Sequence, residues 1–169
     1  ILKEIYPWLR HSDYKVTYSI KTYTSLAEIK HAYATDPSRL RTVDFYTLAQ
    51  SYPIGSNEYR EVFETAVETY PDDPMLNLNA ANIDMESGNL EAAQSHLLKA
   101  GNTPQANYAR GVLAAKRSDY AEATRRFTMA KDGGMAEAEP CLERIEAIKA
   151  YNPVKYRITP IKKKRDNTK

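Results

Sequence analysis

The sequence predicts a mostly α-helical protein of stacked helical hairpins, preceded by a short strand-and-helix segment. Three observations predict it: a pattern of small and large residues that recurs along the chain, helix-start and helix-end residues between the copies, and a period-two alternation near the N-terminus. With 42% hydrophobic residues among 169, the chain can bury a sizeable core. We divide it into residues 1–38, 39–151 and 152–169.

The first segment contains a pattern typical of a half-buried strand. Over residues 14–23, tyrosine, valine and isoleucine alternate with lysine, threonine and serine. One strand is not stable alone, so we expect it to pair with residues upstream of Ile1 or with another chain. Ser25 and Glu28 then have capping-box spacing and predict a helix through about Tyr33.

The middle segment contains an internal repeat. Ala66, Ala100 and Ala130 occupy the same place in three copies, 34 and 30 residues apart. Residues at spacings of three and four share a helix face, and small residues there let a neighbouring helix approach closely. A single hairpin cannot bury its apolar face, so we expect the copies to stack. The aligned second helices read EYREVFETAVETYPDDP, GNLEAAQSHLLKAGNTP and SDYAEATRRFTMAKDGG.

Residues that favour helix ends separate the copies. Asp73-Pro74 and Thr103-Pro104 place a capping side chain before a proline, which is typical of a helix start. Three glycines stand where helices should end: Gly88, Gly101 and Gly133. The stretch MAEAEPCLERIEAIKAY predicts a terminal helix that covers the last hairpin.

Residues from about Leu40 to Tyr151 resemble the tetratricopeptide-repeat (TPR) family. The third copy matches the family pattern most fully, at Gly111, Tyr120, Ala123, Phe127 and Ala130. The first copy departs from it, with Tyr59 where a small residue is usual, and the second lacks the aromatic residue of the first helix. The resemblance implies a TPR-like superhelix whose first helices line a concave groove for a peptide.

The whole chain is also similar to the C-terminal part of envelope proteins from anaerobic Gram-negative bacteria. The similarity lies in YPWLRHSDYKVTYSIKTY, LAQSYPIGSNEYREVFETA and PDDPMLNLNAAN. In those proteins an OmpA-like β/α segment runs into TPR-like repeats. The similarity implies that residues 1–38 are the remnant of a larger α/β domain in a periplasmic or outer-membrane-associated protein. It also implies contact with peptidoglycan through a missing N-terminal domain.

Asparagines in the second copy suggest where a partner binds. Asn77, Asn79 and Asn82 stand on an expected helix, where asparagine is unfavourable. Asn82 falls at the TPR-family position that bonds the backbone of a bound peptide, and Lys116 could hold a C-terminal carboxylate. The alternative is that these asparagines cap helices, bridge them or face water. The predicted partner-binding groove consists of Asn79, Asn82, Met85, Tyr108, Val112 and Lys116.

Other functional classes have little support in the sequence. It contains no His-Glu-x-x-His motif, nucleophile elbow or phosphate-binding glycine loop, so we expect no enzyme, cofactor or metal site. We expect the only cysteine, Cys141, to pack as a small apolar group and His96 to face solvent. No apolar run is long enough to span a membrane.

The C-terminal tail differs in charge from the rest of the chain. From Lys155 onward seven basic residues stand against one acid, a formal charge of +6, so the overall +2 leaves residues 1–154 at −4. A short basic run on an acidic body favours a solvated tail or a contact with an acidic neighbour over binding to nucleic acid or anionic lipid.

These observations lead to two main hypotheses. The first is a non-enzymatic scaffold that binds a protein or peptide within a bacterial envelope assembly. The second is a structural brace for an OmpA-like domain, with peptidoglycan attachment as the activity of the whole protein. An enzyme ranks third.

Overall fold

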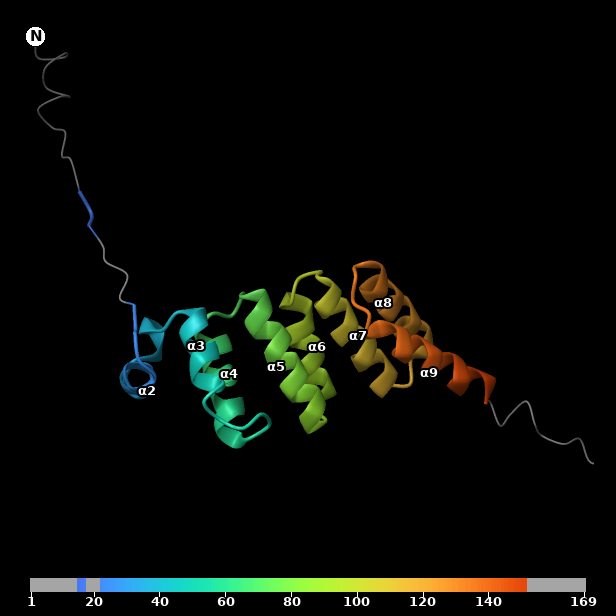
Figure 1. Ribbon diagram of the computed structural model, residues 1–169, viewed down its shortest axis with the longest axis horizontal. Coiled ribbons are helices and arrows are strands. Elements are labelled where there is room, and N and C mark those ends of the chain that lie inside the picture. Colours follow the sequence, from blue (N-terminus) through green and yellow to red (C-terminus); the bar gives the residue numbers. More distant parts are fainter. Residues whose placement is uncertain (1–14, 18–21, 152–169) are drawn as a thin grey trace, which may run out of the picture.

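The computed structural model describes residues 15–17 and 22–151, which contain eight α-helices, one short 3-10 helix and no strand. The helices follow one another along an elongated body (Figure 1). They are α2 (Leu26–Thr35), η1 (Pro37–Arg39), α3 (Thr42–Ala49), α4 (Asn57–Thr69), α5 (Pro74–Ser87), α6 (Leu90–Lys99), α7 (Pro104–Lys116), α8 (Tyr120–Asp132) and α9 (Ala138–Ala150).

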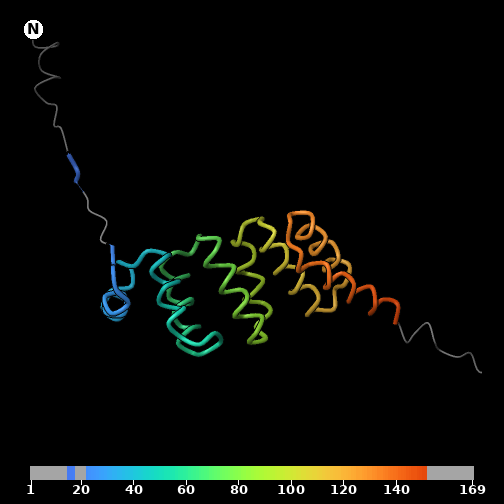
Figure 2. The backbone as a smooth tube through the Cα atoms, viewed as in Figure 1, coloured from blue at the N-terminus to red at the C-terminus, as the bar shows by residue number. Residues whose placement is uncertain are grey.

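The helices pack as sequential antiparallel pairs, as the internal repeat predicts. The pairs α3–α4, α5–α6 and α7–α8 are successive hairpins, and α9 covers α8 (Figure 2). The first helices α5 and α7 also touch each other directly. The region 39–151 therefore consists of three hairpins and a terminal helix. None of the described helices is long and apolar enough to cross a membrane.

The predicted strand is not seen where the structure describes that stretch. Residues 15–17, 22 and 23 have no strand conformation, and the rest of residues 14–23 lies outside the described residues. A strand needs a neighbour to satisfy its backbone N–H and C=O groups, and no described segment supplies one. Tyr23 is instead buried in the core beside α2.

The helix predicted after Ser25 is confirmed. The Ser25 hydroxyl accepts a hydrogen bond from the Glu28 backbone N–H at 3.3 Å, and the Glu28 carboxylate accepts one from the Thr24 N–H at 2.9 Å. The helix ends at Thr35, two residues beyond the predicted Tyr33. It shares one core cluster with α3 and α4, so α2 and Tyr23 before it pack on the first hairpin.

Small residues sit at the closest helix contacts. The predicted small–large–small residues are buried in the second and third copies: Ala93, Leu97, Ala100, Ala123, Phe127 and Ala130. In the first copy Phe63 and Ala66 are buried, whereas Tyr59 is half-buried. Large side chains fill the space between them, such as Phe45 and Phe63 in the first cluster. Gly111 on α7 lies against the Phe127 ring of α8, where an added Cβ would stand 2.8 Å from ring carbons.

The predicted helix starts are confirmed, and the helix ends are more varied. Asp73 and Thr103 cap α5 and α7 through their side chains, with a proline as the first helical residue in each case. Gly88 ends α5 at a left-handed φ of 82°. In the next hairpin Ser118 adopts a φ of 61° at the equivalent place, although it is not glycine.

Gly133 ends α8 for a different reason from the one predicted. Its φ of −78° is open to any residue, so no conformational freedom is needed there. A Cβ on Gly133 would instead stand 2.6 Å from Cγ of Pro104, the first residue of α7. The glycine is therefore required by close packing between the end of α8 and the start of α7.

Gly111→Ala should destabilise the protein. Overpacking against the Phe127 ring costs about 1–3 kcal/mol, which exceeds the gain in helix propensity of about 1 kcal/mol. Urea denaturation followed by circular dichroism measures the change. In a Phe127→Leu background the same alanine should be tolerated or stabilising, because the clashing ring is gone. An equal cost in both backgrounds would contradict this account of the contact.

Candidate functional site

A groove of about 480 Å³ lies between the first helices of two successive hairpins, α5 and α7. All six residues predicted for the partner-binding groove line it: Asn79, Asn82, Met85, Tyr108, Val112 and Lys116. Met75, Leu78, Glu86, Gln105, Ala109 and Met135 complete its walls. The structure therefore brings the predicted residues together on one surface.

Helical spacing explains why these residues meet. On α5 the lining positions recur at intervals of three and four from Met75 to Met85. On α7 they do the same from Gln105 to Lys116. Each helix thus presents one face to the groove, and direct packing of α5 on α7 places the two faces side by side.

The groove has an apolar floor and a polar rim. Leu78, Met85 and Ala109 are buried at its base, and Val112 is half-buried beside them. Asn82 and Lys116 are exposed at the rim, and neither side chain forms a hydrogen bond or ion pair with the described part of the chain. An apolar floor with a few unpaired polar groups is the usual composition of a ligand cleft.

Two other lining residues already have partners. The Asn79 amide donates to the Tyr46 hydroxyl at 3.2 Å and to the Met75 carbonyl at 2.8 Å, so it bridges α5 and α3. The Tyr108 hydroxyl lies 3.5 Å from Cys141 Sγ. That contact, together with burial, raises the pKa of Tyr108 to about 12. Tyr108 therefore offers the groove its neutral ring more than a free hydroxyl.

Asn77 does not belong to the groove. Its side chain is 0% exposed, and its amide donates to the backbone carbonyls of Pro71 at 2.9 Å and Asp73 at 2.8 Å. Its oxygen lies 3.0 Å from Nδ1 of His96 on α6. Asn77 thus ties the start of α5 to the second helix of its own hairpin, which is the bridging alternative considered for these asparagines.

The same arrangement recurs in the next hairpin, 30 residues later. Asn107 is buried at the equivalent position of α7, and its amide donates to the Asn102 side chain at 3.1 Å and to the Thr103 carbonyl at 3.2 Å. Its oxygen accepts a hydrogen bond from Nη1 of Arg126 on α8 at 3.1 Å. Each of these two hairpins therefore contains a buried asparagine held by a basic side chain of the partner helix.

The prediction that His96 faces solvent is wrong. Its side chain is 29% exposed and lies between Asn77 and Asp84, with Nε2 at 3.7 Å from the Asp84 carboxylate. Burial raises the pKa of Asp84, and the charges of His96 and Arg60 act in the opposite direction. The residue pattern of α6 alone places the His96 ring on the exposed face of the helix. The packing of α6 on α5 covers part of this ring.

Cys141 is half-buried, as predicted for a packed thiol. Its Sγ lies 3.6 Å from the Glu137 carbonyl one turn earlier on α9. Among residues 15–17 and 22–151, no group of three or more His, Cys, Asp or Glu side chains is arranged to hold a metal ion.

Glu122 anchors the arginine that holds Asn107. Its carboxylate accepts hydrogen bonds from Arg126 at 2.7 Å and from Arg125 at 2.8 and 2.6 Å. The hydrogen bonds of Arg125 and then Arg126 hold the pKa of Glu122 at about 2, against an ordinary value of 4.5. The ionised carboxylate is thus favoured by the folded state.

Asn77→Ala should cost about 2 kcal/mol of unfolding free energy. It removes the donor to two backbone carbonyls and leaves a buried gap beside His96. Asn82→Ala is the matched control on the same helix, and it should change stability by less than about 0.5 kcal/mol because Asn82 is exposed. Urea denaturation measures both. Similar losses in the two variants would contradict the division between a structural and a free asparagine.

The contribution of Glu122 to stability should be lost in acid. Its pKa is lower in the folded state, so the contribution is complete above about pH 4.5 and disappears as the pH falls toward about 2. The difference in unfolding free energy between the unmodified chain and Glu122→Gln should therefore shrink over that interval. Urea titrations at several pH values measure it. A difference that stays constant from pH 6 to pH 2 would refute the ion-pair account.

Comparisons with known proteins do not assign the chain to a family. No protein-family model matches it, and a search of curated proteins finds no significant relative.

Proposed function

We propose that the chain is a non-enzymatic scaffold that binds a protein or peptide in the groove between α5 and α7. One observation carries the proposal. The groove combines a buried apolar floor with two exposed polar side chains, Asn82 and Lys116, that have no partner in the described part of the chain. A surface of this kind can bury apolar side chains of a partner while it bonds the partner's backbone.

A peptide would use the two parts of the groove differently. Its apolar side chains would pack on Leu78, Met85 and Val112, where flexible methionine can adapt to different shapes. The Asn82 amide can donate to a backbone carbonyl and accept from a backbone N–H at the same time. The Lys116 ammonium can bind a carbonyl or a carboxylate but cannot accept a hydrogen bond.

The proposal includes a TPR-like architecture for residues 39–151. Support comes from the sequential antiparallel hairpins and from the small–large–small residues buried 34 and 30 residues apart. The Asn77–His96 contact recurs as Asn107–Arg126, which adds support. The second and third hairpins therefore share a contact between their two helices as well as a sequence pattern. A periplasmic or outer-membrane-associated location is proposed from the OmpA-like resemblance alone.

A second candidate is a structural brace for an OmpA-like domain that attaches to peptidoglycan. One feature favours it. Tyr23 and Ile29 are buried in the same core cluster as Phe45 and Phe63, so residues 22–35 are fixed to the first hairpin. A domain upstream would then be followed directly by a segment that packs on the stack.

Peptide selection tests the scaffold proposal. A random peptide library displayed on phage is selected against the chain, and the affinity of the selected peptides is measured by fluorescence anisotropy. Asn82→Ala/Lys116→Glu should weaken binding by roughly thirtyfold, through loss of about two hydrogen bonds. The matched control is Arg144→Glu, which reverses an exposed cation outside the groove.

The outcomes separate the two candidates. Binding that is lost in the double variant and kept in Arg144→Glu supports the groove, provided that circular dichroism shows both variants folded. Peptides that bind all three proteins equally would place the binding surface elsewhere and refute the groove. Failure to select any peptide would refute the peptide-binding proposal and leave the structural brace.

A further inference from the structure

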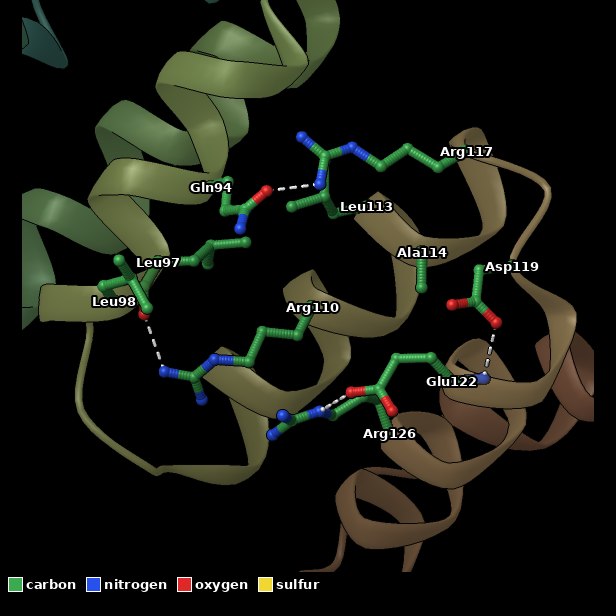
Figure 3. A pocket seen from close by; sticks show the side chains of 10 residues that line it. All are labelled: Gln94, Leu97, Leu98, Arg110, Leu113, Ala114, Arg117, Asp119, Glu122 and Arg126. Atoms are coloured by element: carbon green, nitrogen blue, oxygen red, sulfur yellow. Dashed lines mark hydrogen bonds and ion pairs between the residues drawn. The ribbon is translucent and has the colours of Figure 1, made fainter.

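A second pocket lies where α6, α7 and α8 meet (Figure 3). The residues of α7 that line it are on a different face of the helix from those that line the groove. Its volume is about 230 Å³. Three arginines line it, and leucines of α6 and α7 form an apolar wall (Figure 3). The arginines are Arg110, Arg117 and Arg126.

Two of the arginines are paired with carboxylates and the third is not. Arg117 binds Glu91 at 2.7 Å, and Arg126 binds Glu122 at 2.7 Å. Arg110 is half-buried and donates from Nη2 to two backbone carbonyls, those of Leu97 and Gly101, each at 2.6 Å. No carboxylate of the described residues bonds it, and its Nε and Nη1 donors have no partner there.

The position of Arg110 is electrostatically costly. Burial, and then the neighbouring charge of Arg126, lower the pKa of Arg110. Figure 3 shows the two guanidinium groups on the same side of the pocket. The nearest acids are already engaged, because Glu122 is shared by two arginines and Asp119 caps α8 by accepting the Glu122 N–H at 3.0 Å.

The hydrogen bonds of Arg110 to backbone carbonyls explain only part of why a guanidinium group is placed here. The two carbonyls lie at the C-terminal end of α6, where a cation is favourable, so Arg110 helps to hold α7 against α6. They use a single nitrogen of the guanidinium group. Nε and Nη1 have no acceptor among the described residues and remain accessible to water, on a residue that lines the pocket.

Charge and size limit what the pocket can bind. Four arginines (110, 117, 125 and 126) stand against three acids (Glu91, Asp119 and Glu122), so the local excess is one positive charge. That excess matches a monoanion. A volume of about 230 Å³ is below the range of about 300–1,000 Å³ usual for drug-sized ligands, so the pocket suits one small group. Leu98, on its rim, is 78% exposed and offers apolar contact.

We propose that this pocket binds a carboxylate attached to a small apolar group, either a free acid or the last residue of a peptide. Arg110 binds the carboxylate through its free donors, with Arg126 beside it. The apolar group packs on Leu97, Leu98 and Leu113. The site is independent of the groove, because the two lie on different faces of α7.

Titration with N-acetyl-leucine, followed by the backbone amide signals of the ¹⁵N-labelled chain, tests the proposal. The acid should shift the Leu98 and Arg110 signals saturably with a millimolar dissociation constant. N-acetyl-leucinamide, which has the same apolar group and no charge, should not. Arg110→Gln should weaken binding about tenfold, because it removes charged hydrogen bonds and keeps a donor for α6. Arg144→Gln is the matched control and should bind normally.

A rim variant covers the case in which Arg110→Gln does not fold. Leu98 is exposed, so Leu98→Asp and Leu98→Asn should both fold, and only the first places a like charge beside the ligand. The aspartate should weaken binding at least tenfold more than the asparagine. Acetyl-Gly-Gly-Leu separates the sources: tighter binding than N-acetyl-leucine indicates a peptide C-terminus, and equal binding indicates a free acid. Absence of saturable shifts, equal shifts from acid and amide, or unchanged affinity in the charged variants would overturn the proposal.

Discussion

The close approach of the two helices in each hairpin is the constraint on which the rest of the structure depends. Gly111 lies against the Phe127 ring with no room for a Cβ. Elsewhere buried alanines such as Ala81, Ala93 and Ala123 allow neighbouring helices to pack closely. Hairpins packed this tightly stack with their first helices adjacent. The groove between α5 and α7 is a consequence of that stacking, because neither helix could form it alone.

Most of the fold could be predicted because its signals are local. Asp73-Pro74 and Thr103-Pro104 mark helix starts through contacts within one turn, and the spacing of small residues marks a packed face. Features that depend on contacts between helices could not be predicted from the sequence. Gly133 has the sequence context of an ordinary helix end, but it is packing against Pro104 that requires glycine there. Ser118 adopts a left-handed conformation that its residue type does not predict.

The same distinction applies to the two surfaces. The six groove residues could be predicted because helical spacing places those of each helix on one face, and the TPR resemblance implies that first helices line a shared groove. The roles of Asn77 and His96 could not, since their contact joins two helices. One signal was present: Asn77 and Asn107 are 30 residues apart, and each is followed 19 residues later by a basic side chain. The carbonyl partners of Arg110 leave no trace in the sequence, because any residue supplies a carbonyl.

Polar side chains in this stack fall into two groups with different consequences. Asn77 and Asn107 are buried with several partners each, so they hold the hairpins and have little left to offer a ligand. Asn82, Lys116 and Arg110 keep donors without acceptors beside apolar surface. Asn82 and Lys116 are exposed and Arg110 is half-buried, so each can donate to a ligand without breaking a hydrogen bond within the stack. Under the functions proposed above, recognition would therefore depend on polar groups that the helix packing leaves unpaired.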